Sequence, residues 1–122
     1  SKSQSALMSA QKISKKVVKV GFEWDSVESL KECIKSEYKE FEEAVASGES
    51  DKMEDEMGDI LFATVNLARW YKIDAEQALL SSNRKFTARF KKMEEIKTKP
   101  FEEYSYDEFN ELWKKAKIEL GK

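Results

Sequence analysis

Apolar residues recur at intervals of three and four positions along nearly the whole chain, which is the period of one face of an α-helix. No segment of useful length alternates between apolar and polar residues as a half-buried strand does. The 122 residues include one proline and four glycines, fewer turn residues than most sheet proteins need. The sequence therefore predicts an all-α fold, and its length suits a single domain over residues 1–122 with one modest core.

Capping signals divide this helical chain into segments. Five helices are expected, over residues 5–20, 26–46, 50 or 51 to 71, 74–96 and 105–120. Asp25 with Glu28, and Ser105 with Glu108, have the spacing of a capping box, and Asp74 opens the fourth helix. Since short connections favour antiparallel neighbours, we expect a bundle of about four to five helices.

The composition excludes several kinds of site. The chain has no histidine, so it cannot by itself build a Ser–His–Asp triad, a Cys–His pair or a His-ligated zinc site. Its one cysteine, Cys33, excludes an internal disulfide and a multi-cysteine metal site. With 22 basic and 24 acidic residues the net charge is −2, which indicates no affinity for a nucleic-acid polymer or an anionic membrane.

No targeting or membrane signal is apparent. No apolar run reaches the roughly 18–20 residues that span a bilayer, and residues 1–5 lack the apolar region of a signal peptide. We therefore expect a soluble, cytoplasmic protein. Because the chain starts without Met, we also expect a processed product or a piece of a longer chain.

The third predicted helix contains a run, residues 60–68, that is apolar nearly all round. Such a helix is usually buried on most sides, and a chain of this size has few helices to cover it. We therefore predict that a second copy of the chain covers one side, as a homodimer or a dimer of dimers. The alternative is a monomer in which the first and last helices provide the cover.

Two pairs of carboxylates lie on helix faces that also carry apolar residues. At about 100° per residue, Glu37 and Glu40 fall at the edge of the apolar arc of the second helix, and Glu56 and Asp59 fall among apolar residues of the third. The two helices are joined by a short turn at Gly48, so they should lie antiparallel and bring the pairs to one level.

Four carboxylates gathered at a site of low dielectric constant repel one another, so they must bind protons or cations. Without a His or Cys cluster, the expected cation is a hard, oxygen-binding ion, Mg²⁺ or Mn²⁺. The alternative is that nearby lysines or arginines pair with the acids. Gly58, which lowers helix stability by about 1 kcal/mol relative to Ala, permits close approach of a ligand or of another backbone.

The carboxylates belong to a wider pattern of motifs. The chain reads Gly21-Phe-Glu-Trp24, then Glu37-x-x-Glu40, then Glu54-Asp-Glu-Met-Gly-Asp-Ile-Leu-Phe62, and finally Asn83-x-Lys-Phe-x-x-Arg-Phe90. In this order and at these separations, the pattern resembles the MazG family of nucleoside triphosphate pyrophosphohydrolases over about residues 11 to 120. The chain looks most like the C-terminal, catalytically competent half of the family's tandem-domain members.

The resemblance implies an all-α fold, an obligate dimer and a Mg²⁺-dependent site that converts a nucleoside triphosphate to its monophosphate and pyrophosphate. It implies that the metal ligands and catalytic residues are Glu37, Glu40, Glu56 and Asp59. It implies that the substrate-contacting residues are Lys52, Asp55, Asn83, Lys85, Arg89 and Trp113. Ser36 and Cys33 depart from the family pattern, since many members have an acid at the first position and some have Lys at the second.

The expected reaction is in-line attack of water at the α–β phosphate linkage, with one of the four carboxylates or a metal-bound hydroxide as the base. Lys85 and Arg89, four positions apart, would neutralise phosphate charge; the alternative is a solvated basic face. Trp113, like Phe22 and Trp24, could stack on a base or simply pack in the core. Two other functions stay open: an all-α hydrolase of a deoxynucleotide such as dUTP or dCTP, and a helical interaction module without catalysis.

Overall fold

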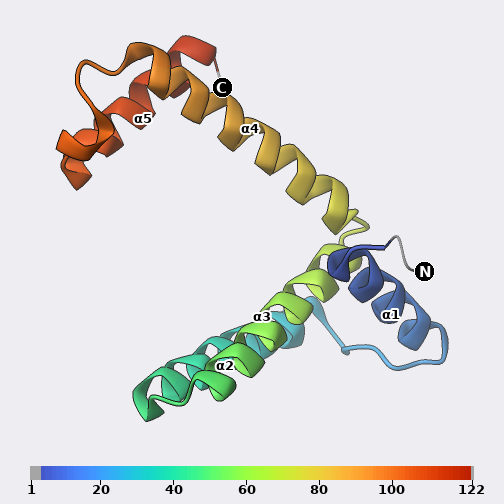
Figure 1. Cartoon of the computed structure of the whole chain (residues 1–122). Coiled ribbons are helices and arrows are strands. Elements are labelled where there is room, and N and C mark those ends of the chain that lie inside the picture. The colour runs from blue at the N-terminus through green and yellow to red at the C-terminus, as the bar shows by residue number, and fades with distance from the viewer. Residues whose placement is uncertain (1–3, 122) are drawn as a thin grey trace. The chain divides into compact units, whose positions relative to one another are not determined.

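A computed structural model describes residues 4–121, and within that range it shows only helices and their connections (Figure 1). In chain order the elements are α1 (Ala6–Lys19), α2 (Val27–Ser47), α3 (Ser50–Trp70), α4 (Ala75–Ile96), the short 3-10 helix η1 (Phe101–Glu103) and α5 (Tyr106–Leu120). The predicted all-α class and the five predicted helices are confirmed. No helix among the described residues is long and apolar enough to cross a bilayer.

The helix ends follow the capping signals, with one exception. In α5 the Ser105 side chain accepts from the Glu108 backbone and the Glu108 side chain accepts from the Ser105 backbone, so the predicted capping box is present. The prediction that Asp25 caps the second helix is wrong. Ser26 is the N-cap of α2 and accepts a hydrogen bond from the Ser29 backbone N–H at 3.1 Å. The Asp25 carboxylate accepts from the Ser29 hydroxyl instead.

The chain divides within α4, after Ala78, into two compact units. In the first unit α2 and α3 lie side by side and antiparallel, and α1 packs against α3 (Figure 1). The reversal between α2 and α3 occurs at Gly48, whose φ of +74° is in the left-handed region that favours glycine. The apolar core of this unit consists of Leu30, Ala44, Ile60, Ala63 and Val65.

A buried polar network ties α1 and the connection after it to α3. The Ser14 hydroxyl, fully buried, donates to Asn66 Oδ1 at 2.5 Å. Arg69 Nε donates to Ser14 Oγ at 2.6 Å, and the two terminal nitrogens of Arg69 donate to the Glu23 carboxylate at 2.7 and 2.8 Å. This bidentate ion pair anchors the connection between α1 and α2.

Within the first unit, the apolar run of α3 is covered on one side only. Ile60, Ala63 and Val65 are buried, but Leu61 and Phe62 are 59% and 38% exposed. The helices of this unit therefore do not by themselves bury α3 on most sides.

The second unit is held by aromatic packing between the end of α4, η1 and α5. Met93, Leu112 and Ala116 are buried, and Phe101 lies against three other rings at centroid distances of 5.4 to 6.0 Å. Pro100 precedes η1, a turn of helix that the apolar periodicity did not predict because it is only three residues long.

Candidate active site

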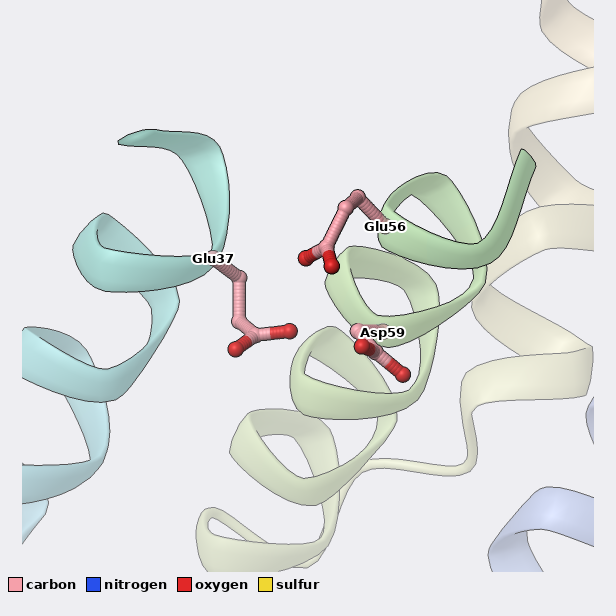
Figure 2. A group of neighbouring side chains, drawn as sticks. All are labelled: Glu37, Glu56 and Asp59. Carbon is pink, nitrogen blue, oxygen red and sulfur yellow. The ribbon is translucent and has the colours of Figure 1, made fainter. Parts of the chain in front are cut away.

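Three carboxylates converge between α2 and α3. Figure 2 shows Glu37 pointing from α2 toward Glu56 and Asp59 on α3. One carboxylate oxygen of each lies within 4.8 Å of those of the other two. Glu56 and Asp59 are three positions apart and therefore share a helix face, and the reversal at Gly48 brings Glu37 to the same level. The arrangement is one that a single hard cation can bridge.

Glu40 lies at the edge of this group. Its side chain is exposed, and it is not among the three carboxylates that converge. It is nevertheless near enough to raise the pKa of both Glu37 and Glu56. The sequence predicted four carboxylates at one level; the structure places three together with the fourth beside them.

The site favours protonation or a cation. Burial raises the pKa of Glu37 to about 7, helped by a hydrogen bond with Glu40 and by the charges of Asp59, Glu40 and Glu56. Burial also raises the pKa of Glu56, with further contributions from the charges of Glu40, Asp59 and Asp55. Glu56 Oε2 is buried without a hydrogen-bond partner among the described residues. An unpartnered buried carboxylate oxygen beside other acids is an open ligand position for a cation.

The alternative, that basic residues neutralise these acids, finds no support in the first unit. Among its described residues, Lys35 pairs with Glu32, Lys52 with Glu49 and Arg69 with Glu23. No lysine or arginine of residues 4–78 forms an ion pair with any of the four predicted metal ligands.

The raised pKa of Glu37 predicts how pH changes the stability of the metal-free protein. The folded state holds the Glu37 proton to about pH 7, whereas a glutamate in the unfolded chain loses it near pH 4.5. The stabilising contribution is thus complete below pH 4.5 and is lost as pH rises through 7. In urea unfolding with chelator, the free energy of unfolding should fall between pH 5 and pH 8. The fall should be smaller in Glu37→Gln; an identical fall in both proteins would contradict the assignment.

The residues around the carboxylates are mostly exposed. Lys52 pairs with Glu49, and Asp55 lines a shallow acidic depression with Asp51, Glu54, Gly58 and Asp59. A Cβ added at Gly58 would meet no side chain or neighbouring helix of the first unit within 4 Å, so packing between the helices of this unit does not require a glycine here. Cys33, one turn before Glu37, is half-buried, and burial together with the charges of Glu37 and Glu40 raises the pKa of its thiol.

The remaining predicted substrate residues belong to the second unit. Asn83 and Lys85 are exposed on α4, and Arg89 on the same helix is half-buried. The Arg89 guanidinium lies over the ring of Trp113, which is half-buried on α5. In the first unit, the side chain of Phe22 is 75% exposed, which is unlike a packed connection between helices.

Sequence reasoning missed the buried network that holds the C-terminal end of α3. Ser14, Glu23, Asn66 and Arg69 were not identified as a group. One signal was present: Ser14 lies on the same face of α1 as Ala10 and Val17, where a polar side chain needs a buried partner.

The amino-acid sequence matches one known protein family over the segment that holds the converging carboxylates. The family described as MazG nucleotide pyrophosphohydrolase domain matches residues 25–94, a segment that holds all four acids and also Asn83, Lys85 and Arg89.

Three relatives cover different shares of the chain. "Nucleoside triphosphate pyrophosphohydrolase/pyrophosphatase MazG" of Thermotoga maritima is 43% identical over 115 residues, which are 92% of this chain and 44% of the relative. "Nucleoside triphosphate pyrophosphohydrolase" of Escherichia coli K12 is 45% identical over 93 residues, 75% of this chain and 35% of the relative. "Uncharacterized protein YabN" of Bacillus subtilis is 45% identical over 65 residues, 51% of this chain and 13% of the relative.

The chain thus spans less than half the length of each of these relatives. The family match nevertheless covers more than half of the chain, including the converging carboxylates and the helix that follows them. The chain belongs to the MazG nucleotide pyrophosphohydrolase family.

Proposed function

We propose that the chain, acting as one functional domain, hydrolyses nucleoside triphosphates to nucleoside monophosphate and pyrophosphate. The observation that carries the proposal is the convergence of Glu37, Glu56 and Asp59 inside the segment that matches the family. The printed names of the Thermotoga and Escherichia relatives describe the same reaction for those proteins.

The proposed cofactor is Mg²⁺, with Mn²⁺ as a substitute, because all the converging donors are carboxylate oxygens. Glu37, Glu56 and Asp59 would hold it, with Glu40 at the edge of the site. A cation held there would reverse the local negative charge and so would allow an anionic triphosphate to approach.

The chain's own residues would then position and deprotonate the reactants. One carboxylate of the group, Glu37, Glu40, Glu56 or Asp59, would accept the proton of the attacking water. The new bond joins the water oxygen to one phosphorus of the α–β linkage, and the bond from that phosphorus to the bridging oxygen breaks. The bridging oxygen leaves with the other fragment, so the products are the monophosphate and pyrophosphate. Lys85 and Arg89 would neutralise phosphate charge, Asn83 would donate to a phosphate or sugar oxygen, and Lys52 and Asp55 would contact the substrate from α3.

Product analysis tests the proposal. We expect monophosphate and pyrophosphate from a panel of ribo- and deoxyribonucleoside triphosphates with Mg²⁺, and no product with excess chelator. Turnover of a single deoxynucleotide such as dUTP or dCTP, or of its diphosphate, would favour the all-α deoxynucleotide hydrolase. A folded protein that turns over no nucleotide and binds no Mg²⁺ would favour the interaction module.

We also propose that copies of the chain associate, either as a homodimer or as a dimer of dimers. The exposed apolar side chains of α3, among them Met57, Leu61 and Phe62, support this assembly. Sedimentation equilibrium should give a mass of at least twice the 14.2 kDa of one chain. Leu61→Asp should shift the protein toward the monomer, whereas Leu79→Asp, at an exposed leucine of α4, serves as the matched control.

A further inference from the structure

Trp113, which packs against the core cluster of its unit, also contacts two side chains from one face of α4. The centroids of the Phe86 and Trp113 rings are 5.3 Å apart, and the rings are tilted by 41°. The guanidinium carbon of Arg89 lies 5.3 Å from the centroid of the Trp113 ring, within the range of a cation–π interaction. Phe86 and Arg89 are three positions apart, so they reach the ring from the same side of the helix.

Arg89 has few other constraints in its unit. No acidic side chain among residues 79–121 forms an ion pair with it. Its Nε is buried without a hydrogen-bond partner among the described residues. Among residues 79–121, the Trp113 ring is therefore the one group that attracts the Arg89 guanidinium electrostatically.

This arrangement differs from that of Arg69, whose charge is matched by the Glu23 carboxylate through two hydrogen bonds. An aromatic face attracts a guanidinium without cancelling its charge. It also restricts a long side chain that would otherwise lose conformational entropy on binding a phosphate. A guanidinium held in this way is preorganised to bind an anion, because it keeps its charge and its side chain is already restricted.

We infer that Trp113 is a positioning residue that holds Arg89 for the phosphates of the substrate, and not a platform on which the base stacks. The inference rests on the proposed function, in which Arg89 neutralises phosphate charge. The family model matches residues 25–94, which include Arg89 but not Trp113; the contact between the two side chains is seen in the structure.

A positioning role and a stacking role predict different patterns of specificity. The phosphates are the same in every nucleoside triphosphate, so a loss transmitted through Arg89 is the same for every base. Stacking depends on the size of the base, so its loss is greater for purines than for pyrimidines.

The experiment compares kcat/KM for ATP, GTP, CTP and UTP in four variants and one control variant with that of the wild type. Trp113→Leu removes the aromatic face, and Trp113→Phe keeps a smaller one. Arg89→Gln removes the charge, and the double variant combines Arg89→Gln with Trp113→Leu. The matched control is Phe109→Leu, which makes the same kind of change on α5 within the aromatic cluster but away from Arg89. Thermal melting of each variant reports its folding.

We expect Trp113→Leu to lower kcat/KM by about tenfold, equally for all four substrates. Trp113→Phe should recover part of that loss. In the Arg89→Gln background, Trp113→Leu should cause no further loss, because the group that it positions is already gone. Phe109→Leu should lower the melting temperature without this change in kcat/KM.

Three results would overturn the inference. The first is a greater loss for purines than for pyrimidines. The second is a full additional loss in the Arg89→Gln background. The third is an equal loss of kcat/KM in Phe109→Leu. Wild-type protein that releases no pyrophosphate would overturn the proposed function and the inference with it, so the two failures are told apart by the wild type.

Discussion

Glu56→Gln should lower the rate of pyrophosphate release by about 10³-fold or more and leave the metal-free protein at least as stable as the wild type. Glu56 converges with Glu37 and Asp59, and its Oε2 is buried without a hydrogen-bond partner among the described residues. The amide keeps the shape of the side chain but cannot supply a negative ligand. Because burial and then the surrounding charges raise the pKa of Glu56, removing its own charge relieves both desolvation and repulsion in the absence of metal.

The measurement is the initial rate at saturating Mg²⁺, together with urea unfolding in chelator. Glu54→Gln is the matched control, since Glu54 is an exposed acid on the same helix two positions away. A wild-type rate in Glu56→Gln would exclude Glu56 as a ligand. An equal loss in Glu54→Gln would mean that the general negative charge of α3, and not the three-carboxylate group, supports turnover.

Arg69→Met should lower the free energy of unfolding by about 3 kcal/mol. The Arg69 side chain is 12% exposed and binds both the Glu23 carboxylate and the buried Ser14 hydroxyl. Met fills similar space but leaves Glu23, itself 26% exposed, without its cation. The cost is that of an uncompensated, largely buried charge together with a hydroxyl that has lost its donor.

Urea unfolding measures this change, and Arg84→Met, at an exposed arginine of α4, is the control, with an expected change within about 0.5 kcal/mol. Adding Glu23→Gln to Arg69→Met should restore part of the stability, because it removes the unpaired charge. A loss below about 1 kcal/mol in Arg69→Met would show that the ion pair is screened as a surface pair is.

The helices were predictable because their signals are local. The Ser105–Glu108 capping box and the glycine at position 48 act within one turn of helix, so the printed sequence contains them in full. The choice between Asp25 and Ser26 as N-cap failed because both have suitable side chains. The N-cap is the residue just before the helix, so the choice depends on whether α2 begins at residue 26 or at residue 27, and it begins at Val27.

The candidate site was predictable in part for a related reason. Helical geometry gives the direction of each Cβ, which places Glu37, Glu56 and Asp59 on facing sides of α2 and α3. It does not give the side-chain rotamer, which decides whether Glu40 joins the group or stays exposed at its edge. The contact between Arg89 and Trp113 could not be predicted from the sequence, because it joins two helices whose register is set by packing within their unit.

The two ends of α3 are held in different ways, and this predicts where the molecule opens first. Its C-terminal part is fixed by the buried hydrogen bonds of Asn66 and Arg69, whereas its N-terminal part carries Glu56 and Asp59 among exposed residues and repelling charges. Amide hydrogen exchange of the metal-free protein should therefore be fast near the α2–α3 reversal and slow around residues 63–69. The proposed metal site needs α2 and α3 together, so Mg²⁺ would bind only the closed form. Saturation with Mg²⁺ should therefore slow exchange chiefly at the reversal, because binding lowers the population of the locally open form.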